Sequence, residues 1–247
     1  MHALFCFGTN GEGYILDGRE KQLVLETVIE QANGRVPVYA GTGCVSTRET
    51  IAQSRMARDA GADVLSIITP SFAAASQQEL YDHYRAVAEA VDIPIVLYNI
   101  PARTGNALAP ETVARLSRIE NIVGAKDSSG NWDNMKAYLD GTRGSGFAVL
   151  SGNDGLILDC LKNGGRGGVA GCANVYPRTM ASIYDCFAAG DLEKAQEYQA
   201  SIASFRACFK YGRQNSRGAA GLRRGKMPRT VQPAPGRRRC RAAAGAS

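Results

Sequence analysis

The 247-residue sequence has little of what metal sites, disulfide frameworks and membrane spans require. It has only two histidines, and its seven cysteines include no C-x-x-C pair, which argues against a zinc site and a disulfide framework. No run of about eighteen or more apolar residues is long enough to cross a bilayer. The residues Met1 to Leu4 lack the basic flank and apolar length of a secretory signal. We therefore expect a cytoplasmic protein without a metal or cofactor, whose cysteines are reduced and mostly buried.

Acidic residues are absent from the last part of the chain. Residues 212–247 contain ten basic side chains and no Asp or Glu, whereas residues 1–211 contain 19 basic and 23 acidic ones. The body thus has a net charge of −4, although the whole chain has one of +6. The tail is rich in Gly, Ala, Arg and Pro and buries too little apolar surface to offset the entropy lost on ordering. We expect one large domain at 1–211 and a disordered basic tail at 212–247.

The arginines of this tail could bind phosphate groups, but such binding is salt-dependent and nonspecific. Residues 212–247 contain no aromatic side chain that could stack on nucleic-acid bases. We therefore expect no specific nucleic-acid partner and no membrane partner. A small-molecule site in the body is the better hypothesis.

Short apolar runs alternate with segments of helix-forming composition along the body. Seven such runs start 20 to 32 residues apart, which suits a strand, a crossover helix and two loops. No G-x-G-x-x-G follows the first run, which weakens the case for a dinucleotide-binding sheet. The expected strands are Leu4–Phe7, Val36–Ala40, Val64–Ile68, Ile95–Tyr98, Ile122–Ala125, Ala148–Leu150 and Gly168–Gly171, and the clearest helices are Glu20–Gln31, Thr47–Ala60, Gln77–Ala90 and Pro110–Arg118.

This pattern predicts an α/β protein of the (β/α)8 TIM barrel class. A closed barrel of this class has eight strands, whereas the sequence shows seven apolar runs. The first run begins at Leu4, so we expect the first βα unit of the barrel to be missing ahead of it.

Catalytic groups of such a barrel lie at the C-terminal ends of its strands. Lys126 directly follows the apolar run Ile122–Ala125, which places its amine at the mouth of an apolar interior. Desolvation disfavours the charged form and leaves a free amine that can attack a ketone. The alternative is a lysine paired with a carboxylate at the rim, such as Asp127 or Asp154. Position alone leaves both interpretations open.

Three segments resemble the dihydrodipicolinate synthase and N-acetylneuraminate lyase family of class I, pyruvate-dependent aldolases. Residues Gly8 to Glu12 read G-T-N-G-E and resemble its G-T-T-G-E, Tyr98 to Gly105 resemble its Y-N-x-P-x-R-T-G, and Gly124 to Asp127 read G-A-K-D. The resemblance extends from about Leu4 to Gly212. It implies a TIM barrel and a carbon–carbon lyase or synthase that acts on pyruvate through a lysine Schiff base. Intact relatives are implied to be homo-oligomers.

The resemblance assigns roles to individual residues. Lys126 would condense with the ketone of pyruvate, and the resulting iminium would allow an enamine to form. Tyr98 resembles the family's proton carrier between the Schiff base and the aldehyde or alkoxide. Thr9 and Asn10 lie in the loop that binds the pyruvate carboxylate through backbone N–H groups and a hydroxyl. From the residues alone, Tyr98 could be a packing residue and the loop an ordinary strand-to-helix turn.

Two further positions bear on the second substrate. Arg103 resembles the arginine with which some members hold the carboxylate of that substrate, and an exposed loop arginine is the alternative. The backbone around Val169 would form the opposite wall of the site.

Departures from the family pattern concern the subfamily. Phe72 lacks the hydroxyl of the tyrosine that completes a proton relay in a neighbouring subunit, and Asn10 replaces a threonine. These differences favour a catabolic aldolase that cleaves a 2-keto-3-deoxy sugar acid. Arg103 instead favours 4-hydroxy-tetrahydrodipicolinate synthase, which condenses pyruvate with aspartate semialdehyde in lysine biosynthesis. A truncated, inactive relative is a further alternative.

The sequence of the basic tail indicates how this segment of the gene arose. Residues Gly225 to Gln232 are what a one-nucleotide slip would make of Gly-Lys-Cys-Arg-Ala-Pro-Phe-Asn, a family-like ending. We therefore hypothesise that the tail is a frameshift product. Gene sequencing tests this, because an intact frame without an overlapping Cys-Arg-Ala-Pro reading would contradict it.

Overall fold

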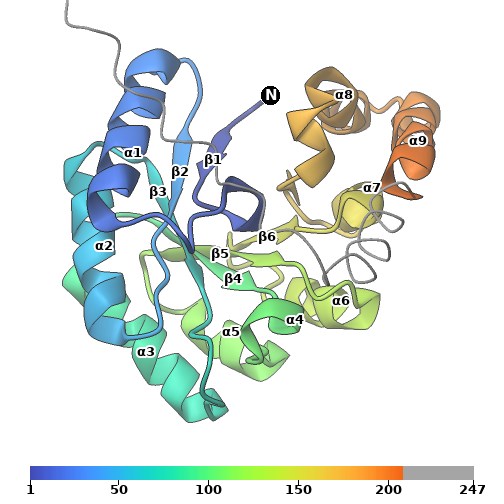
Figure 1. The fold of residues 1–247 in the computed structure, drawn as a ribbon. Helices are drawn as coiled ribbons and strands as arrows, with labels where there is room; N and C mark the ends of the chain where they lie inside the picture. The colour runs from blue at the N-terminus through green and yellow to red at the C-terminus, as the bar shows by residue number, and fades with distance from the viewer. Residues whose placement is uncertain (208–247) are drawn as a thin grey trace, which may run out of the picture. The chain divides into compact units, whose positions relative to one another are not determined.

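A computed structural model of the chain describes residues 1–207, in which seven parallel strands form one curled sheet (Figure 1). Each strand pairs with the next one along the chain, so the order in the sheet is the order in the sequence. Helices cover the outer side of the curl, and the whole is a partial (β/α)8 barrel. The strands are β1 (Leu4–Cys6), β2 (Val38–Gly41), β3 (Val64–Ile68), β4 (Ile95–Asn99), β5 (Ile122–Asp127), β6 (Ala148–Ser151) and β7 (Gly167–Gly168).

The seven strands expected from the sequence are confirmed, although only β3 has the expected bounds, and β5 and β7 differ most in length. Strand β5 continues to Asp127, two residues beyond the expected end at Ala125, because its ladder with β4 continues through Lys126. Lys126 is therefore a paired strand residue and does not follow the strand. Strand β7 has only the two residues Gly167–Gly168.

The helices between these strands begin mostly at side-chain caps. Asp17 accepts hydrogen bonds from the first turn of α1 (Gly18–Ala32), and its own backbone N–H donates one to the Glu20 carboxylate. Ser46 caps α2 (Thr47–Asp59) by accepting a hydrogen bond from the backbone N–H of Glu49. The remaining helices are α3 (Gln77–Ala90), α4 (Pro101–Thr104), α5 (Pro110–Leu116), α6 (Trp132–Gly141), α7 (Ile157–Lys162), α8 (Pro177–Ala188) and α9 (Leu192–Ser201), with 3-10 turns η1 (Thr9–Gly11), η2 (Asp154–Leu156) and η3 (Gly171–Asn174).

The main core lies between the sheet and its outer helices. Side chains alternate along each strand, so residues such as Ile67 and Leu97 point outward into this layer. Tyr84 of α3 and Tyr138 of α6 are also buried there, and each hydroxyl donates a hydrogen bond to a backbone carbonyl. The alternate strand residues therefore face the inside of the curl, where the candidate site lies.

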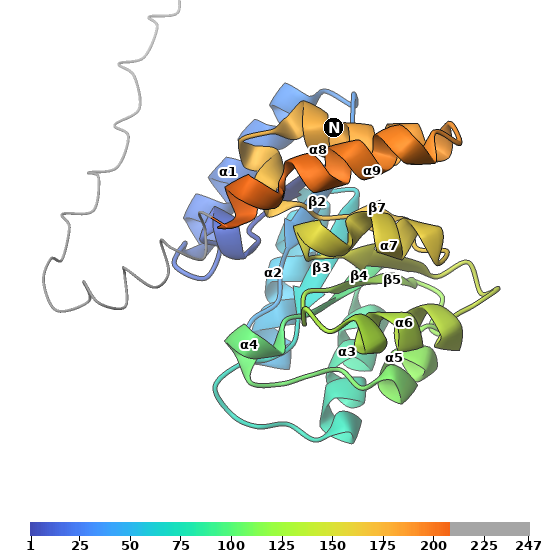
Figure 2. The same cartoon turned by 90° about the vertical axis from the view of Figure 1, so that its right-hand side faces the viewer.

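A second apolar cluster joins the last three described helices. It includes Ile157 of α7 with Met180 and Ile183 of α8. Figure 2 shows α8 and α9 side by side near the β7 edge of the sheet. None of the helices within residues 1–207 combines the length and apolar character that crossing a membrane requires.

The chain divides by its internal contacts into Met1–Arg206 and Ala207–Ser247. The domain boundary predicted at residue 211 and the predicted tail at 212–247 lie outside the described residues.

Burial of His83 is expected to make the stability of this fold depend on pH. His83 lies in α3, with its Nδ1 2.9 Å from the Thr47 Oγ1 of α2, and burial lowers its pKa from 6.5 to about 4. Between these values the unfolded chain binds a proton that the folded chain does not, so the free energy of unfolding falls as the pH falls. From pH 6.8 to 5.2 we expect a loss of about 1.5 kcal/mol.

Urea unfolding at those two pH values measures this loss. Replacing His83 with glutamine should remove most of the difference, because a titrating group is then absent. Replacing His2, the other histidine and an exposed one, should leave it unchanged. An equal pH dependence in H83Q would show that other groups cause it.

Candidate active site

Tyr98 and Lys126 lie side by side at one level of the sheet. Tyr98 belongs to β4 and Lys126 to β5, and the parallel register makes them direct partners. Both side chains point to the inside of the curl, with the Lys126 Nζ 3.8 Å from the centre of the Tyr98 ring. Thr9, from the turn after β1, places its Oγ1 3.2 Å from the Tyr98 hydroxyl oxygen. Three of the residues predicted to carry the chemistry are therefore brought together.

The surroundings of Lys126 are mainly apolar. Lys126 is 6% exposed, and its Nζ lies 4.6 Å from the centre of the Phe5 ring on β1. Burial lowers the pKa of Lys126 below its usual value, against opposing effects of Tyr98 and the Asp154 carboxylate. Aromatic faces attract a cation but cannot hydrate it. The site thus increases the fraction of free amine at neutral pH.

The alternative interpretation, in which Lys126 forms an ion pair at the rim, is not what the structure shows. Among residues 1–207, no salt bridge joins Lys126 to either Asp127 or Asp154. Asp127 points to the opposite face of β5, and Asp154 accepts a hydrogen bond from the backbone N–H of Cys172. Lys126 is a buried amine with a hydroxyl neighbour and two aromatic neighbours.

The turn after β1 has a strained backbone. Phe7 has a φ of +62°, a conformation that a bulky L-residue rarely adopts. A Cβ on Gly13 would lie 2.5 Å, and one on Gly41 2.7 Å, from the Phe7 carbonyl oxygen, so both positions require glycine. These two glycines make room for the turn that brings Thr9 to Tyr98.

Asn10 lies at the exposed side of this turn. Its Nδ2 is 2.8 Å from the point that a Cβ on Gly171 would occupy, so it faces η3. A Cβ on Gly8 would lie 3.2 Å from the Phe5 ring, whereas one on Gly11 would meet nothing within 4 Å. Packing therefore favours glycine at position 8 but does not require it at position 11.

Arg103 belongs to α4 and Phe72 to the loop 70–75, and Asn106, which follows α4, binds this loop. The Asn106 side chain donates hydrogen bonds to two carbonyls of the loop 70–75 and accepts one from its backbone. Phe72 is 99% exposed and has a φ of +82°. Arg103 is also exposed, and its guanidinium has no partner within the described residues. Both side chains are accessible at the rim.

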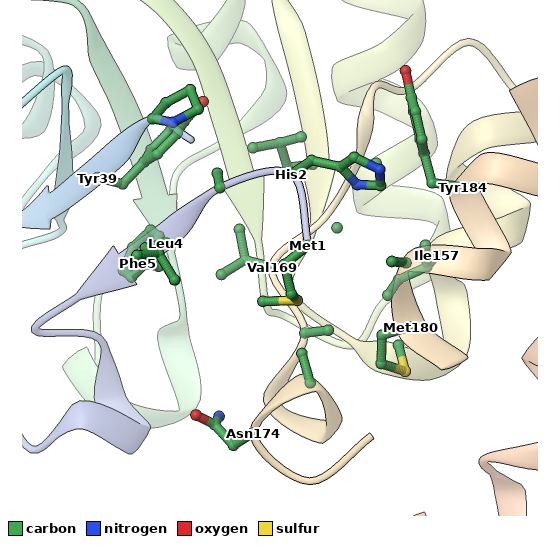
Figure 3. Close-up of a pocket in the computed structure, with 18 of the residues that line it drawn as sticks. Met1, His2, Leu4, Phe5, Tyr39, Ile157, Val169, Asn174, Met180 and Tyr184 are labelled. Atoms are coloured by element: carbon green, nitrogen blue, oxygen red, sulfur yellow. The ribbon is translucent and has the colours of Figure 1, made fainter. Parts of the chain in front are cut away.

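A cavity of about 630 Å³ lies between β1 and β7 (Figure 3). Phe5 and Val169 line it, and Phe5 also contacts Lys126, so the cavity adjoins the catalytic candidates without containing the amine. His2 reaches across this seam and lies 2.8 Å from the Asp185 carboxylate of α8. The role of Val169 in the opposite wall of the site stays a prediction.

Phe5 could not be predicted as a site residue, because nothing in the residues around it indicates that it faces a lysine on another strand. The alternation of Leu4, Phe5 and Cys6 could suggest that Phe5 points inward, but not which residues it meets. Within residues 1–207, no group of His, Cys, Asp and Glu side chains is arranged to hold a metal ion. The arrangement offers a nucleophilic amine beside a pair of hydroxyls.

The chain is similar to known proteins over most of its length. The model of the dihydrodipicolinate synthetase family matches residues 1–213. A 4-hydroxy-tetrahydrodipicolinate synthase of Methanospirillum hungatei is 39% identical over 210 residues, which cover 85% of this chain and 72% of the relative. That of Syntrophus aciditrophicus is 44% identical over 189 residues, which cover 76% of this chain and 65% of the relative. The chain thus spans about two thirds of the length of these relatives.

Solved structures show the same fold. The dihydrodipicolinate synthase of Acinetobacter baumannii, complexed with pyruvate, has a TM-score of 0.80 and 38% identity, covering 83% of this chain and 70% of that one. A prophage protein of the same family from E. coli K12, also in complex with pyruvate, has a TM-score of 0.82 and 31% identity, covering 85% and 72%. The chain therefore belongs to the dihydrodipicolinate synthetase family, whose members are pyruvate-dependent class I aldolases.

Proposed function

We propose that the chain binds pyruvate as an imine on Lys126 and joins it to an aldehyde. The observation that carries this proposal is the buried Lys126 amine, whose pKa is lowered, beside the Tyr98 hydroxyl. The free amine attacks the ketone carbon and water leaves, which gives an iminium. Loss of a proton from the methyl carbon then gives an enamine, whose carbon attacks the aldehyde carbon. Two of the similar structures hold pyruvate, which supports this first substrate.

Tyr98 transfers the protons in this proposal. Its ring lies against the Lys126 Nζ, and its hydroxyl is within hydrogen-bond reach of Thr9. A hydroxyl at this place can receive the proton of the attacking amine and return one to the departing oxygen. The backbone N–H groups of Thr9 and Asn10 are the proposed site for the pyruvate carboxylate.

For the second substrate we propose an aldehyde with a carboxylate, and aspartate semialdehyde in particular. The relatives described above are 4-hydroxy-tetrahydrodipicolinate synthases at 39% and 44% identity. Arg103 at the rim presents an unpaired guanidinium, whose planar fork suits the two oxygens of a carboxylate.

Cleavage of a 2-keto-3-deoxy sugar acid is the second candidate function. Phe72 stands at the rim without the hydroxyl that a tyrosine would offer to a neighbouring subunit. Asn10 offers an amide where the family pattern has a hydroxyl, and an amide can donate to a sugar hydroxyl. Both differences favour a polyhydroxylated substrate over aspartate semialdehyde.

An assay of the full chain with pyruvate and one of two aldehydes distinguishes these candidates. We expect faster product formation with aspartate semialdehyde than with glyceraldehyde, which has no carboxylate. Replacing Arg103 with alanine should lower kcat/KM for aspartate semialdehyde by about 10- to 100-fold, since hydrogen bonds to charged groups contribute about 1.5–3 kcal/mol. Glyceraldehyde turnover should change little.

Arg118, exposed beyond the end of α5, provides the control, because R118A removes the same charge near the start of β5, at the opposite end of the parallel strands from Arg103. Preferential turnover of glyceraldehyde, unaffected by R103A, would favour the sugar-acid function. Failure of pyruvate to form any borohydride-reducible adduct would overturn both candidates.

A further inference from the structure

The strand residues that follow Tyr98 and Lys126 also meet across the two strands. Asn99 and Asp127 are register partners in β4 and β5, one step beyond the partners Tyr98 and Lys126. Because side chains alternate along a strand, Asn99 and Asp127 point to the outer face. The Asn99 Nδ2 donates a hydrogen bond of 2.8 Å to the Asp127 Oδ1. Asn99 is 1% exposed and Asp127 0%, so this bond is sheltered from water.

The two side chains are held by further hydrogen bonds. The Asn99 Oδ1 accepts from the backbone N–H of Leu108, at 3.0 Å. The Asp127 Oδ1 also accepts from the Ser129 backbone, and its Oδ2 accepts from the Ser129 Oγ at 2.8 Å. Among residues 1–207, Asp127 has no salt-bridge partner. A buried carboxylate without a counter-ion depends on such hydrogen bonds, so its geometry is closely defined.

Backbone contacts fix the chain directly beyond this pair. The carbonyl of Asn99 accepts from the Ser128 N–H, and the carbonyl of Asp127 accepts from the Gly152 N–H, each at 2.8 Å. The ends of β4, β5 and β6 are therefore tied together at the level of the catalytic candidates.

The other end of the β4–β5 ladder is irregular. Ile95 pairs with Ile122, but Val96 pairs with Gly124, so the register shifts between them. Because of this bulge, the pairing beyond it decides which residues of β4 and β5 share a level. A specific contact beyond the bulge therefore adds to the definition of the register at Tyr98 and Lys126.

We propose that Asn99 and Asp127 are a positioning pair, which holds Tyr98 and Lys126 at one level by excluding a shifted β4–β5 register. A slip of one residue would turn Lys126 to the outer face and bring the Asp127 carboxylate to the inner one. The Asn99–Asp127 hydrogen bond can form only in the native register. The inference rests on the proposed function, because it concerns the amine that is proposed to bind pyruvate.

Four variants of the full chain test the pair, with two measurements on each. N99A and D127A remove the contact, D127N keeps its shape without the charge, and S129A removes one of the bonds to the carboxylate. The first measurement is the rate at which borohydride traps a pyruvate adduct on Lys126. The second is the pH dependence of Lys126 acylation by an amine-reactive reagent, followed by mass spectrometry, which requires no pyruvate.

We expect N99A and D127A to slow trapping by about 10- to 100-fold, the usual cost of misplacing a reacting group by roughly 1 Å. Their acylation profiles should shift toward the higher pH of an ordinary lysine, because strand ends without this hydrogen bond open more often and admit water to the amine. D127N should remain close to the wild type in both measurements, since its amide oxygen can still accept from Asn99 and its N–H can donate to Ser129. S129A should have a trapping rate and an acylation profile between those of D127N and D127A.

Tyr84→Phe is the matched control, because it removes one buried hydrogen bond, from the Tyr84 hydroxyl to the Ile67 carbonyl, on a different strand. Circular dichroism shows which variants fold. If N99A or D127A does not fold, S129A takes its place in both measurements. Wild-type trapping and acylation in N99A and D127A would overturn the proposal, as would equal losses in Y84F. If the wild type forms no pyruvate adduct, the proposed function fails, but the acylation profiles still decide whether the pair positions Lys126.

Discussion

Replacing Lys126 with alanine is expected to abolish the borohydride-trapped pyruvate adduct of this chain, down to the level of the reagent blank. The reason is that the proposed imine forms on the buried Lys126 amine, whose pKa is lowered by burial. In the wild type, the free amine fraction rises with pH through this lowered pKa. Trapping should therefore reach its plateau at a lower pH than expected for a lysine of pKa 10.5. Mass spectrometry of the reduced protein measures the adduct and its position.

Two variants accompany this experiment. Lys136, an exposed residue of α6 paired with Asp140, provides the control, and K136A should retain the full adduct. Lys126→Met keeps the length of the side chain in an apolar form, so it should fold at least as well as the wild type while losing the adduct. An adduct of normal yield on K126M would place the imine on another amine.

Replacing Tyr98 with phenylalanine is expected to slow proton transfer while leaving the ring against Lys126. The variant loses the hydroxyl that lies 3.2 Å from the Thr9 Oγ1. A positioned acid or base contributes about 10²–10⁴-fold to a rate, so we expect a loss of this order. Exchange of the pyruvate methyl protons in D₂O, followed by NMR, measures enamine formation without a second substrate.

The same exchange experiment separates Tyr98 from a packing role. If Tyr98 only packs against Lys126, removal of its hydroxyl should not slow the reaction. Y98F should then exchange the pyruvate methyl protons at the wild-type rate. Thr9→Val, which keeps the shape of Thr9 without its hydroxyl, should slow exchange by less than Y98F if Tyr98 carries the proton. The reverse order would assign the transfer to Thr9.

The fold was predictable because its signals are local. Most strands coincide with a short apolar run, and Asp17 and Ser46 are helix caps that can be recognised from the sequence alone. The end of β5 was not predictable, because Lys126 and Asp127 are polar residues that resemble the start of a loop. They stay in the strand because Tyr98 and Asn99 pair with them from β4.

The candidate site was predictable where a family motif contains it. The segments around Thr9, Tyr98 and Lys126 could be recognised in the sequence, and the structure brings these three side chains together. The neighbours of Lys126 were harder to predict. Phe5 comes from a strand more than a hundred residues away, and its contact with Lys126 depends on how strongly the sheet curls.

The sequence by itself therefore determined the order of the strands and the identity of the amine and the hydroxyls. These properties follow from local apolar patterns and from residues whose chemistry is specific. The tertiary structure alone decided that Asp127 turns away from Lys126 and binds Asn99. The face on which a strand residue lies depends on the register with the neighbouring strand, and this register is a property of two segments that the linear sequence keeps apart.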